Sequence, residues 1–296
     1  MWAIGGKTVL ITGATSGIGL EAAVGLARLG ARPILVGRDA ARTGAAVNAV
    51  QRWSETEVAS YLCDFSSQAD IRRLAAAIGG NHPRLDVLVN NAGGVHKRRR
   101  LTVDGLEATF ATNHLGYFLL TTLLLERIVQ SAPARIITVA SIGHRRGAID
   151  FNDLELERGY SIMRAYSRSK LANVLFATEL ARRLAGTGVT SNSLHPGAVA
   201  TNIWSGAPFW AKPLIHLLWR PWFITAEEGA RTIIQLAVRP DLDSVTGGYF
   251  ENHRAVAPAP LAQDEALARR LWETSERLVT IRGASAPAAL KGRPTT

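Results

Sequence analysis

Hydrophobic residues along this chain follow two patterns that alternate. Short apolar runs rich in β-branched residues occur at residues 8–11, 33–36, 58–62, 85–89, 135–139 and 189–194. Longer segments with helical period separate them; in the first, Ile18, Ala22, Leu26 and Leu29 form one stripe, and Gly30 follows as a stop signal. A continuous apolar run predicts a strand buried on both faces. Their alternation with helices predicts an α/β protein with a single doubly wound parallel sheet and helices on both faces.

The same alternation predicts one domain. No polar linker interrupts it, so we expect residues 1–282 to fold as a unit. Residues 283–296 are small, polar and rich in proline, and we expect this tail to be disordered. Residues 203–224 depart from the pattern, because they contain four of the seven tryptophans and several prolines.

Composition narrows the class of protein. Hydrophobic residues make up 47% and charged residues 20% of the chain, which is typical of a globular protein and excludes a disordered one. Cys63 is the only cysteine, so the chain can form no internal disulfide, which fits a reducing compartment. The start of the chain does not resemble an export signal, and the longest apolar stretch, residues 115–125, is shorter than the roughly 20 residues that span a bilayer. We expect a cytoplasmic protein, with peripheral membrane contact as the alternative.

The net charge of +10 would attract polyanions, anionic membrane surfaces and phosphorylated cofactors. The basic residues are scattered, however, and the densest run, residues 97–100, has no interleaved aromatic residues and no recognition-helix pattern. We therefore expect no nucleic-acid partner. The histidines lack the spacing of metal ligands, so we also expect no metal site.

A glycine-rich loop joins the first strand to the first helix. It reads Thr12-Gly13-Ala14-Thr15-Ser16-Gly17-Ile18-Gly19. Glycines at such a junction let the backbone turn sharply and approach a pyrophosphate, whose charge lies at the helix N-terminus. Glycines also mark ordinary tight turns, but the position between strand and helix is the one that dinucleotide binding requires.

With this loop the sequence resembles the short-chain dehydrogenase/reductase family. Further matches follow in order: Asn90-Asn91-Ala92-Gly93, Asn113, Ser141, Tyr166-Ser167-Arg168-Ser169-Lys170 and Pro196-Gly197. The resemblance covers residues 5–255 and implies a Rossmann-type fold, a nicotinamide cofactor and hydride transfer between an alcohol and a carbonyl. It implies cofactor contacts at Gly13, Thr15, Ser16, Gly17, Ile18, Gly19, Arg38, Asp64, Phe65, Asn91, Ala92, Gly93, Tyr166, Lys170, Pro196, Gly197, Val199 and Thr201.

The end of the second strand indicates which nicotinamide cofactor is bound. Gly37 stands where enzymes of this family that use NAD carry an Asp, and Arg38 follows it. A planar guanidinium suits a phosphate dianion, so we predict NADP(H). Some NADP-dependent members also have a basic residue at the position of Ser16, which this chain lacks. In the alternative, Arg38 is solvated and Asp39 binds the ribose, although Asp39 is better placed to begin the next helix.

The candidate catalytic residues are Asn113, Ser141, Tyr166 and Lys170. Tyr166 and Lys170 stand four apart and share one face of a helix. A phenol with a pKa near ~10 is a poor base at neutral pH, and we expect the Lys170 ammonium to lower the pKa of Tyr166. The resemblance implies that Ser141 orients the substrate oxygen, that Lys170 also holds the ribose, and that Asn113 anchors a water of a proton relay. Each residue taken singly has a structural reading: a half-buried Tyr, a snorkelling Lys, a turn-capping Asn and a Ser at a strand end.

Several longer matches resemble the retinol dehydrogenase and WW-domain oxidoreductase branch. They lie at residues 113–118, 169–176, 194–197 and 247–250. The branch implies a small lipophilic alcohol, aldehyde or ketone as substrate, such as a retinoid, a steroid or a polyketide, and family members commonly pair as homodimers through the helices of Asn113 and Tyr166. We expect residues 204–223 to be a substrate lid; a membrane contact and a packed helix pair are the alternatives. The rival function is a non-catalytic regulator that binds NADP(H), which the intact catalytic set disfavours.

Overall fold

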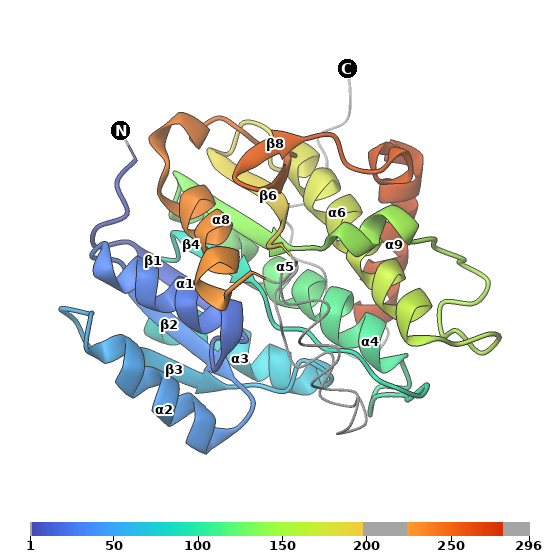
Figure 1. Cartoon of the computed structure of the whole chain (residues 1–296), viewed down its shortest axis with the longest axis horizontal. Coiled ribbons are helices and arrows are strands. Elements are labelled where there is room, and N and C mark those ends of the chain that lie inside the picture. Colours follow the sequence, from blue (N-terminus) through green and yellow to red (C-terminus); the bar gives the residue numbers. More distant parts are fainter. Residues whose placement is uncertain (1, 198–223, 281–296) are drawn as a thin grey trace.

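The described residues are built on one eight-stranded sheet (Figure 1). The computed structural model describes residues 2–197 and 224–280. The strands are β1 (Thr8–Thr12), β2 (Arg32–Gly37), β3 (Ala59–Leu62), β4 (Val87–Asn90), β5 (Ala134–Val139), β6 (Val189–His195), β7 (Tyr249–Glu251) and β8 (Arg254–Val256). Their order is β3-β2-β1-β4-β5-β6-β7-β8; all pairs are parallel except β7 with β8. The predicted α/β architecture with a doubly wound parallel sheet is confirmed.

Helices cover both faces of the sheet. The longer ones are α1 (Gly17–Arg28), α2 (Ala40–Gln51), α3 (Gln68–Asn81), α5 (Gly116–Gln130), α6 (Ile162–Arg183), α8 (Ala226–Val238) and α9 (Glu265–Thr280). Short helical turns are α4 (Ala108–Phe110), η1 (Ala111–Leu115), η2 (Ile142–Arg146), η5 (Pro240–Leu242) and η6 (Pro260–Gln263). The core on one face joins α1, α2 and α8, and the core on the other joins α3, α5 and α6. Along β1, Val9 and Ile11 lie in the first core and Leu10 lies in the second, because successive side chains point to opposite faces.

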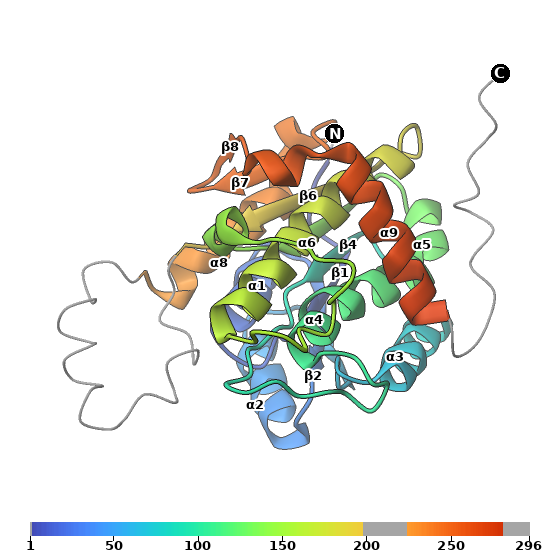
Figure 2. The same ribbon diagram turned by 90° about the vertical axis from the view of Figure 1, so that its right-hand side faces the viewer.

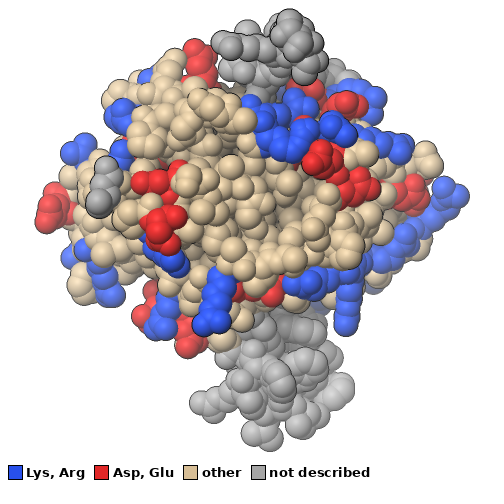
Figure 3. All heavy atoms as spheres, turned by 90° about the horizontal axis from the view of Figure 1, so that it is seen from above, with Lys and Arg blue, Asp and Glu red and all other residues tan. Residues whose placement is uncertain are grey.

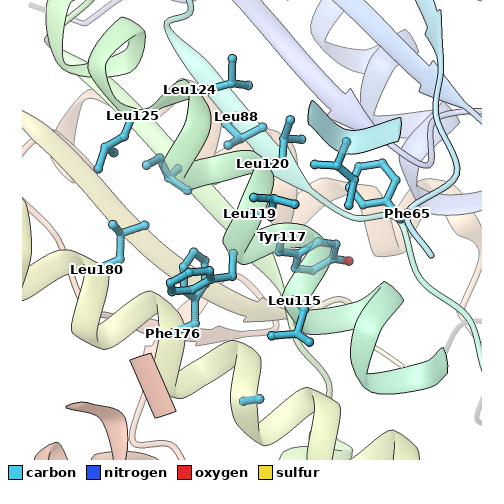
Figure 4. Close-up of a cluster of buried hydrophobic side chains, with 14 of the residues drawn as sticks. Phe65, Leu88, Leu115, Tyr117, Leu119, Leu120, Leu124, Leu125, Phe176 and Leu180 are labelled. Atoms are coloured by element: carbon cyan, nitrogen blue, oxygen red, sulfur yellow. The ribbon is translucent and has the colours of Figure 1, made fainter. Parts of the chain in front are cut away.

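The larger core lies between the sheet, α5 and α6 (Figure 4). Leu119, Leu120 and Leu124 of α5 and Phe176 of α6 are buried there. Burial on both faces explains why β1, β2, β4 and β5 are mostly apolar and could be recognised in the sequence.

Helix α9 forms a further layer outside α5 and α6 (Figure 2). Its Trp272 is 2% exposed, stacks on Phe176 with ring centroids 5.9 Å apart, and meets Phe118 edge-on at 4.8 Å. Ser275 of the same helix lies 2.9 Å from Nε2 of the buried His114. The C-terminal helix is therefore anchored in the core.

All six predicted strands are present, and the structure adds β7 and β8 at the edge beyond β6. Each of these two strands has only three residues, too few for a periodic signal. Among the described residues, no helix combines the length and the apolar character needed to cross a bilayer. Residues 204–223 and the tail 283–296 lie outside the described residues, as do Val199 and Thr201.

Candidate active site

The candidate residues gather at the carboxyl edge of the parallel sheet. Gly13 follows β1, Asn91 follows β4, Ser141 follows β5, and Pro196 follows β6. The chain winds outward from β1 through β2 to β3 and then returns to place β4 on the other side of β1. Ligands of doubly wound sheets bind at such a reversal of strand order.

The glycine-rich loop is closely packed against the segment that follows β4. A Cβ at Gly13 would lie 2.7 Å from Cα of Ala92, and a Cβ at Gly19 would lie 2.5 Å from both Asn91 Nδ2 and the Gly13 carbonyl oxygen. Gly13 and Gly17 have φ values of +66° and +56°, which favour glycine. Side chains at Gly13 or Gly19 would therefore deform the loop.

Asn91 and Thr12 hold this loop in shape. Asn91 Nδ2 donates to the carbonyls of Thr12 (2.8 Å) and Gly13 (3.2 Å). The buried Thr12 hydroxyl accepts from the backbone amides of Asn91 (2.8 Å) and Ala92 (3.0 Å). The side chain of Asn91 thus supports the loop. The Thr12 hydroxyl supports the loop as well, and Thr12 was not among the residues predicted from the sequence.

The N-terminus of α1 is suited to an anion. Its N-cap Ser16 makes no side-chain capping bond, and the first turn of α1 carries no acidic residue. A Cβ at Gly17 would meet nothing within 4 Å, so the backbone opens onto free space there. The amides of the first turn and the helix dipole both favour a negatively charged group at this position. Ile18 is partly buried against the neighbouring core.

The end of β2 leaves no room for a carboxylate at position 37. A Cβ on Gly37 would lie 2.1 Å from Thr43 Oγ1 and 2.4 Å from Thr15 Cγ2. Asp39 caps α2 by accepting from the Arg42 amide at 2.8 Å, as its sequence position suggested.

Two guanidinium groups lie on this side of the loop. Arg38 is exposed. Arg42, in the first turn of α2, donates from Nη2 to Ser16 Oγ at 3.1 Å. Arg42 was not among the residues predicted from the sequence; its place in the first turn of the helix that follows Arg38 was the available signal. The Arg42 guanidinium places a positive charge beside Ser16, and position 16 itself carries no basic residue.

Two further expected contacts lie at the end of β3. Asp64 Oδ1 accepts from the amide (2.9 Å) and the hydroxyl (2.8 Å) of Ser66. Phe65 is 6% exposed and packs in the core, where a Cβ on Gly116 would approach its ring to 2.8 Å. Its side chain, labelled in Figure 4, is a core residue, so its backbone is the part left for a ligand.

Tyr166 and Lys170 share one face of α6, with Lys170 Nζ 5.7 Å from the centroid of the Tyr166 ring. Lys170 is 6% exposed and donates to the Val139 carbonyl at 3.0 Å. Burial lowers the pKa of Lys170 to about 8. The sequence led us to expect a lowered pKa at Tyr166. In the structure burial raises the pKa of Tyr166, and a hydrogen bond with Ser141 acts in the opposite direction.

Ser141 follows β5 and caps η2. Its Oγ accepts from the Gly143 amide at 3.1 Å, which occupies one lone pair and leaves the hydroxyl hydrogen free to donate. Gly143 lies between the Tyr166 ring and the Ser141 hydroxyl. It was not predicted from the sequence. A Cβ there would lie 3.2 Å from Tyr166 Cε1 and 3.5 Å from Ser141 Oγ.

Asn113 is fully buried in the π-helical turn η1. Its Oδ1 accepts from the Gly94 amide at 2.8 Å, and its Nδ2 donates to the Gly94 carbonyl and to Ser169 Oγ, both at 3.0 Å. The side chain thus joins the segment after β4 to α6 between Tyr166 and Lys170. A Cβ on Gly93 would come within 3.1 Å of Asn113 Oδ1. Such π-turns recur at functional sites, and the hydrophobic pattern gives no signal for this one.

The last expected segment follows β6. Gly197, next to Pro196, has φ +95°, and a Cβ there would lie 2.3 Å from Ile224 Cδ1. Across the described residues, no three His, Cys, Asp or Glu side chains are grouped as metal ligands would be. On the face shown in Figure 3, Lys and Arg side chains are interspersed with Asp and Glu.

Comparison with known proteins gives consistent matches. The family model of the short chain dehydrogenases matches residues 7–210. Retinol dehydrogenase 14 of Mus musculus is 45% identical over 289 residues, which cover 93% of this chain and 86% of that protein. Retinol dehydrogenase 13 of Homo sapiens is 44% identical, with 95% and 87% covered, and the WW domain-containing oxidoreductase of Pongo abelii is 42% identical, with 93% and 68% covered.

Solved structures agree. An uncharacterised protein from Mycobacterium paratuberculosis has a TM-score of 0.75 at 34% identity, covering 94% of this chain and 95% of that one. The NADP active-site complex of RhlG from Pseudomonas aeruginosa has a TM-score of 0.68 at 26% identity, covering 90% and 98%. These matches support a hydride-transfer oxidoreductase with a nicotinamide cofactor that acts on alcohol or carbonyl groups. The chain belongs to the short-chain dehydrogenase/reductase family, in its retinol dehydrogenase-like branch.

Proposed function

We propose that this protein is an NADP(H)-dependent oxidoreductase that interconverts a lipophilic alcohol with its aldehyde or ketone. The observation that carries this proposal is the grouping of Ser141, Tyr166 and Lys170 at the carboxyl edge of the sheet. Tyr166 and Lys170 share one face of α6, and the Tyr166 ring and the Ser141 hydroxyl both lie beside Gly143, where a Cβ would be 3.2 Å from Tyr166 Cε1 and 3.5 Å from Ser141 Oγ. All three are intact, which is the reason to prefer an enzyme over a regulator that only senses the cofactor.

The choice of NADP(H) over NAD(H) rests on the end of β2. Position 37 has no space for a carboxylate, and the carboxylate of Asp39 caps α2. Arg38 is exposed, and Arg42 reaches the glycine-rich loop at Ser16. Two guanidinium groups with no competing carboxylate suit a ribose 2′-phosphate. The RhlG relative, whose structure is a complex with NADP, agrees with this choice.

The residues of the loop would hold the cofactor, and the nicotinamide supplies or takes up the hydride when bound. Gly13, Ser16, Gly17 and the first turn of α1 would bind the pyrophosphate. Lys170, which is buried and carries its ammonium at the carboxyl edge, would bind the nicotinamide ribose.

Two side chains act on the substrate oxygen in this proposal, and two others support them. Ser141 donates a hydrogen bond to it from the hydroxyl that Gly143 leaves free. In the reductive direction Tyr166 donates its phenolic proton to the same oxygen, and in the oxidative direction it removes that proton. Lys170 favours the phenolate by its charge. Asn113 fixes the segment after β4 against α6 and would anchor the water that returns a proton to Lys170.

A lipophilic substrate is supported by two exposed apolar side chains that lie close in the sequence to the proposed catalytic residues. Ile142 directly follows Ser141 and is 46% exposed, and Met163, three residues before Tyr166, is 57% exposed. Large apolar side chains on a surface beside a polar reacting centre are typical of a site for a hydrophobic ligand. The retinol dehydrogenases among the relatives favour the same substrate class.

A cofactor-consumption screen tests the proposal. Lipophilic aldehydes and ketones, retinal among them, are offered with NADPH and in parallel with NADH, and nicotinamide absorbance is followed. We expect turnover with NADPH at a higher kcat/KM than with NADH. Binding of NADPH without turnover of any member of the panel would instead favour the regulatory function.

A further inference from the structure

His144 is a buried histidine beside the candidate catalytic serine, and the proposed mechanism does not use it. It belongs to η2 and is 1% exposed. Its Nδ1 lies 2.7 Å from the Ser141 carbonyl oxygen, and its Nε2 accepts from the Ala259 amide at 3.0 Å. Its ring meets that of Tyr249 of β7 at a tilt of 58°, with centroids 4.6 Å apart. The imidazole thus joins the segment after β5 to the segment after β8.

These two contacts fix the protonation state of the ring. The Ala259 amide can only donate, so Nε2 must present a lone pair. The Ser141 carbonyl can only accept, so Nδ1 must carry the hydrogen. His144 is therefore neutral with its hydrogen on Nδ1. Burial lowers its pKa, which acts in the same direction.

The Nδ1 contact constrains the backbone of Ser141 at its carbonyl oxygen. Residue 144 holds the Ser141 carbonyl twice, with its backbone amide at 3.1 Å and with Nδ1 at 2.7 Å. The Gly143 amide holds the hydroxyl at 3.1 Å. Carbonyl and hydroxyl belong to the same residue, so fixing one restricts the direction of the other.

We propose that His144 is a positioning residue for Ser141: its Nδ1–H fixes the serine backbone, and its Nε2 anchors that clamp on the C-terminal segment at Ala259. This inference rests on the proposed role of Ser141 in the reaction. It assigns the catalytic effect to the Nδ1 bond and only a supporting effect to the Nε2 bond.

Two substitutions separate these bonds. His144→Asn places an amide nitrogen near the position of Nδ1 and keeps a donor for the Ser141 carbonyl. His144→Gln places its amide oxygen near the position of Nε2 and keeps an acceptor for Ala259. We expect His144→Gln and His144→Ala to lower kcat about tenfold or more, because small misplacements of a reacting group have large effects on rate. His144→Asn should recover most of that loss.

The affinity for NADPH, measured by fluorescence titration, should stay unchanged in all three variants, since none of them touches the glycine-rich loop. His82 is the matched control. It bonds to Tyr61 and precedes β4, at the amino edge of the sheet opposite the site, so His82→Gln should leave kcat unchanged.

Equal losses in the Asn and Gln variants, or losses confined to NADPH affinity, would overturn the inference. A second readout does not depend on turnover. Nitrogen NMR of the ring in the unmodified protein should show a protonated Nδ1 and an unprotonated Nε2, and the opposite tautomer would also overturn it. Absence of turnover in the unmodified protein, with the expected tautomer present, would count against the proposed function and leave the clamp in place.

Discussion

The buried ammonium of Lys170 shows how single residues of this site differ from their counterparts at the surface. Lys170 is 6% exposed, and within the described residues its ammonium donates to the carbonyl of Val139. Burial without a carboxylate partner disfavours the charged form, and the pKa falls from 10.5 to about 8. A residue that is proposed to bind the cofactor and to take part in proton transfer therefore destabilises the folded protein.

A stability prediction follows for Lys170→Met. Between pH 8 and pH 10.5 the unfolded chain binds a proton that the folded chain has released, so the free energy of unfolding of the unmodified protein rises with pH across this window. Lys170→Met removes the buried charge and should raise the free energy of unfolding at pH 7 by about 1–3 kcal/mol. Urea denaturation at a series of pH values measures this. The gain should shrink as pH rises through the window, and a variant that is less stable at pH 7 would contradict the account.

Arg42 provides the residue-scale prediction for the cofactor. Arg42→Ala removes the guanidinium beside Ser16 and should weaken NADPH binding about tenfold, the size of one charge-assisted bond, with little effect on NADH. Arg38→Asp should erase or reverse the preference. Arg52, which is exposed at the far end of α2, is the matched control. Fluorescence titration of the unmodified protein and the variants with NADPH and NADH measures these affinities. Equal affinities for the two cofactors in the unmodified protein would refute the NADP(H) assignment.

At the scale of elements, the sequence predicts helices and strands that have a periodic hydrophobic pattern. It does not predict features that depend on a single tertiary contact. The strands β1, β2, β4 and β5 are buried along almost their whole length and are mostly apolar, so their runs could be read directly. The edge strand β3 is only partly buried, and β6 is buried but mostly polar. The candidate catalytic residues could be predicted because their order along the chain resembles that of a family. The π-turn at Asn113, the Arg42 contact and the close fit of Gly143 beside Tyr166 each depend on one three-dimensional neighbour and leave no periodic trace.

Helix α9 carries the element-scale prediction. Trp272 fills the space against Phe118 and Phe176, and the Arg183 guanidinium lies 4.4 Å from the centroid of its ring. Trp272→Ala should lower the free energy of unfolding by about 3–5 kcal/mol, and Trp272→Phe by clearly less. Chemical denaturation measures both. A loss below about 1 kcal/mol for the alanine variant would mean that α9 is only loosely attached.

At the scale of the whole molecule, α9 also bears on assembly. The family resemblance suggests a homodimer through the helices of Asn113 and Tyr166, but α9 packs along α6 and reaches α5 through the contact of Trp272 with Phe118 (Figure 2). A dimer of that kind would have to displace a helix whose Trp272 and Ser275 are both buried. We therefore expect sedimentation as a monomer at micromolar concentration. A stable dimer would show that another surface is used or that α9 moves.

The measurement that tests the central claim most directly is the turnover of Tyr166→Phe. The substitution keeps the ring and its packing on α6 and removes only the hydroxyl that is proposed to exchange a proton with the substrate oxygen. On a carbonyl substrate confirmed with the unmodified protein, kcat should fall by about 10²–10⁴, while the Kd for NADPH stays unchanged. A Tyr166→Phe variant that keeps most of its turnover would contradict the proposed chemistry, even though the fold and the family would stand.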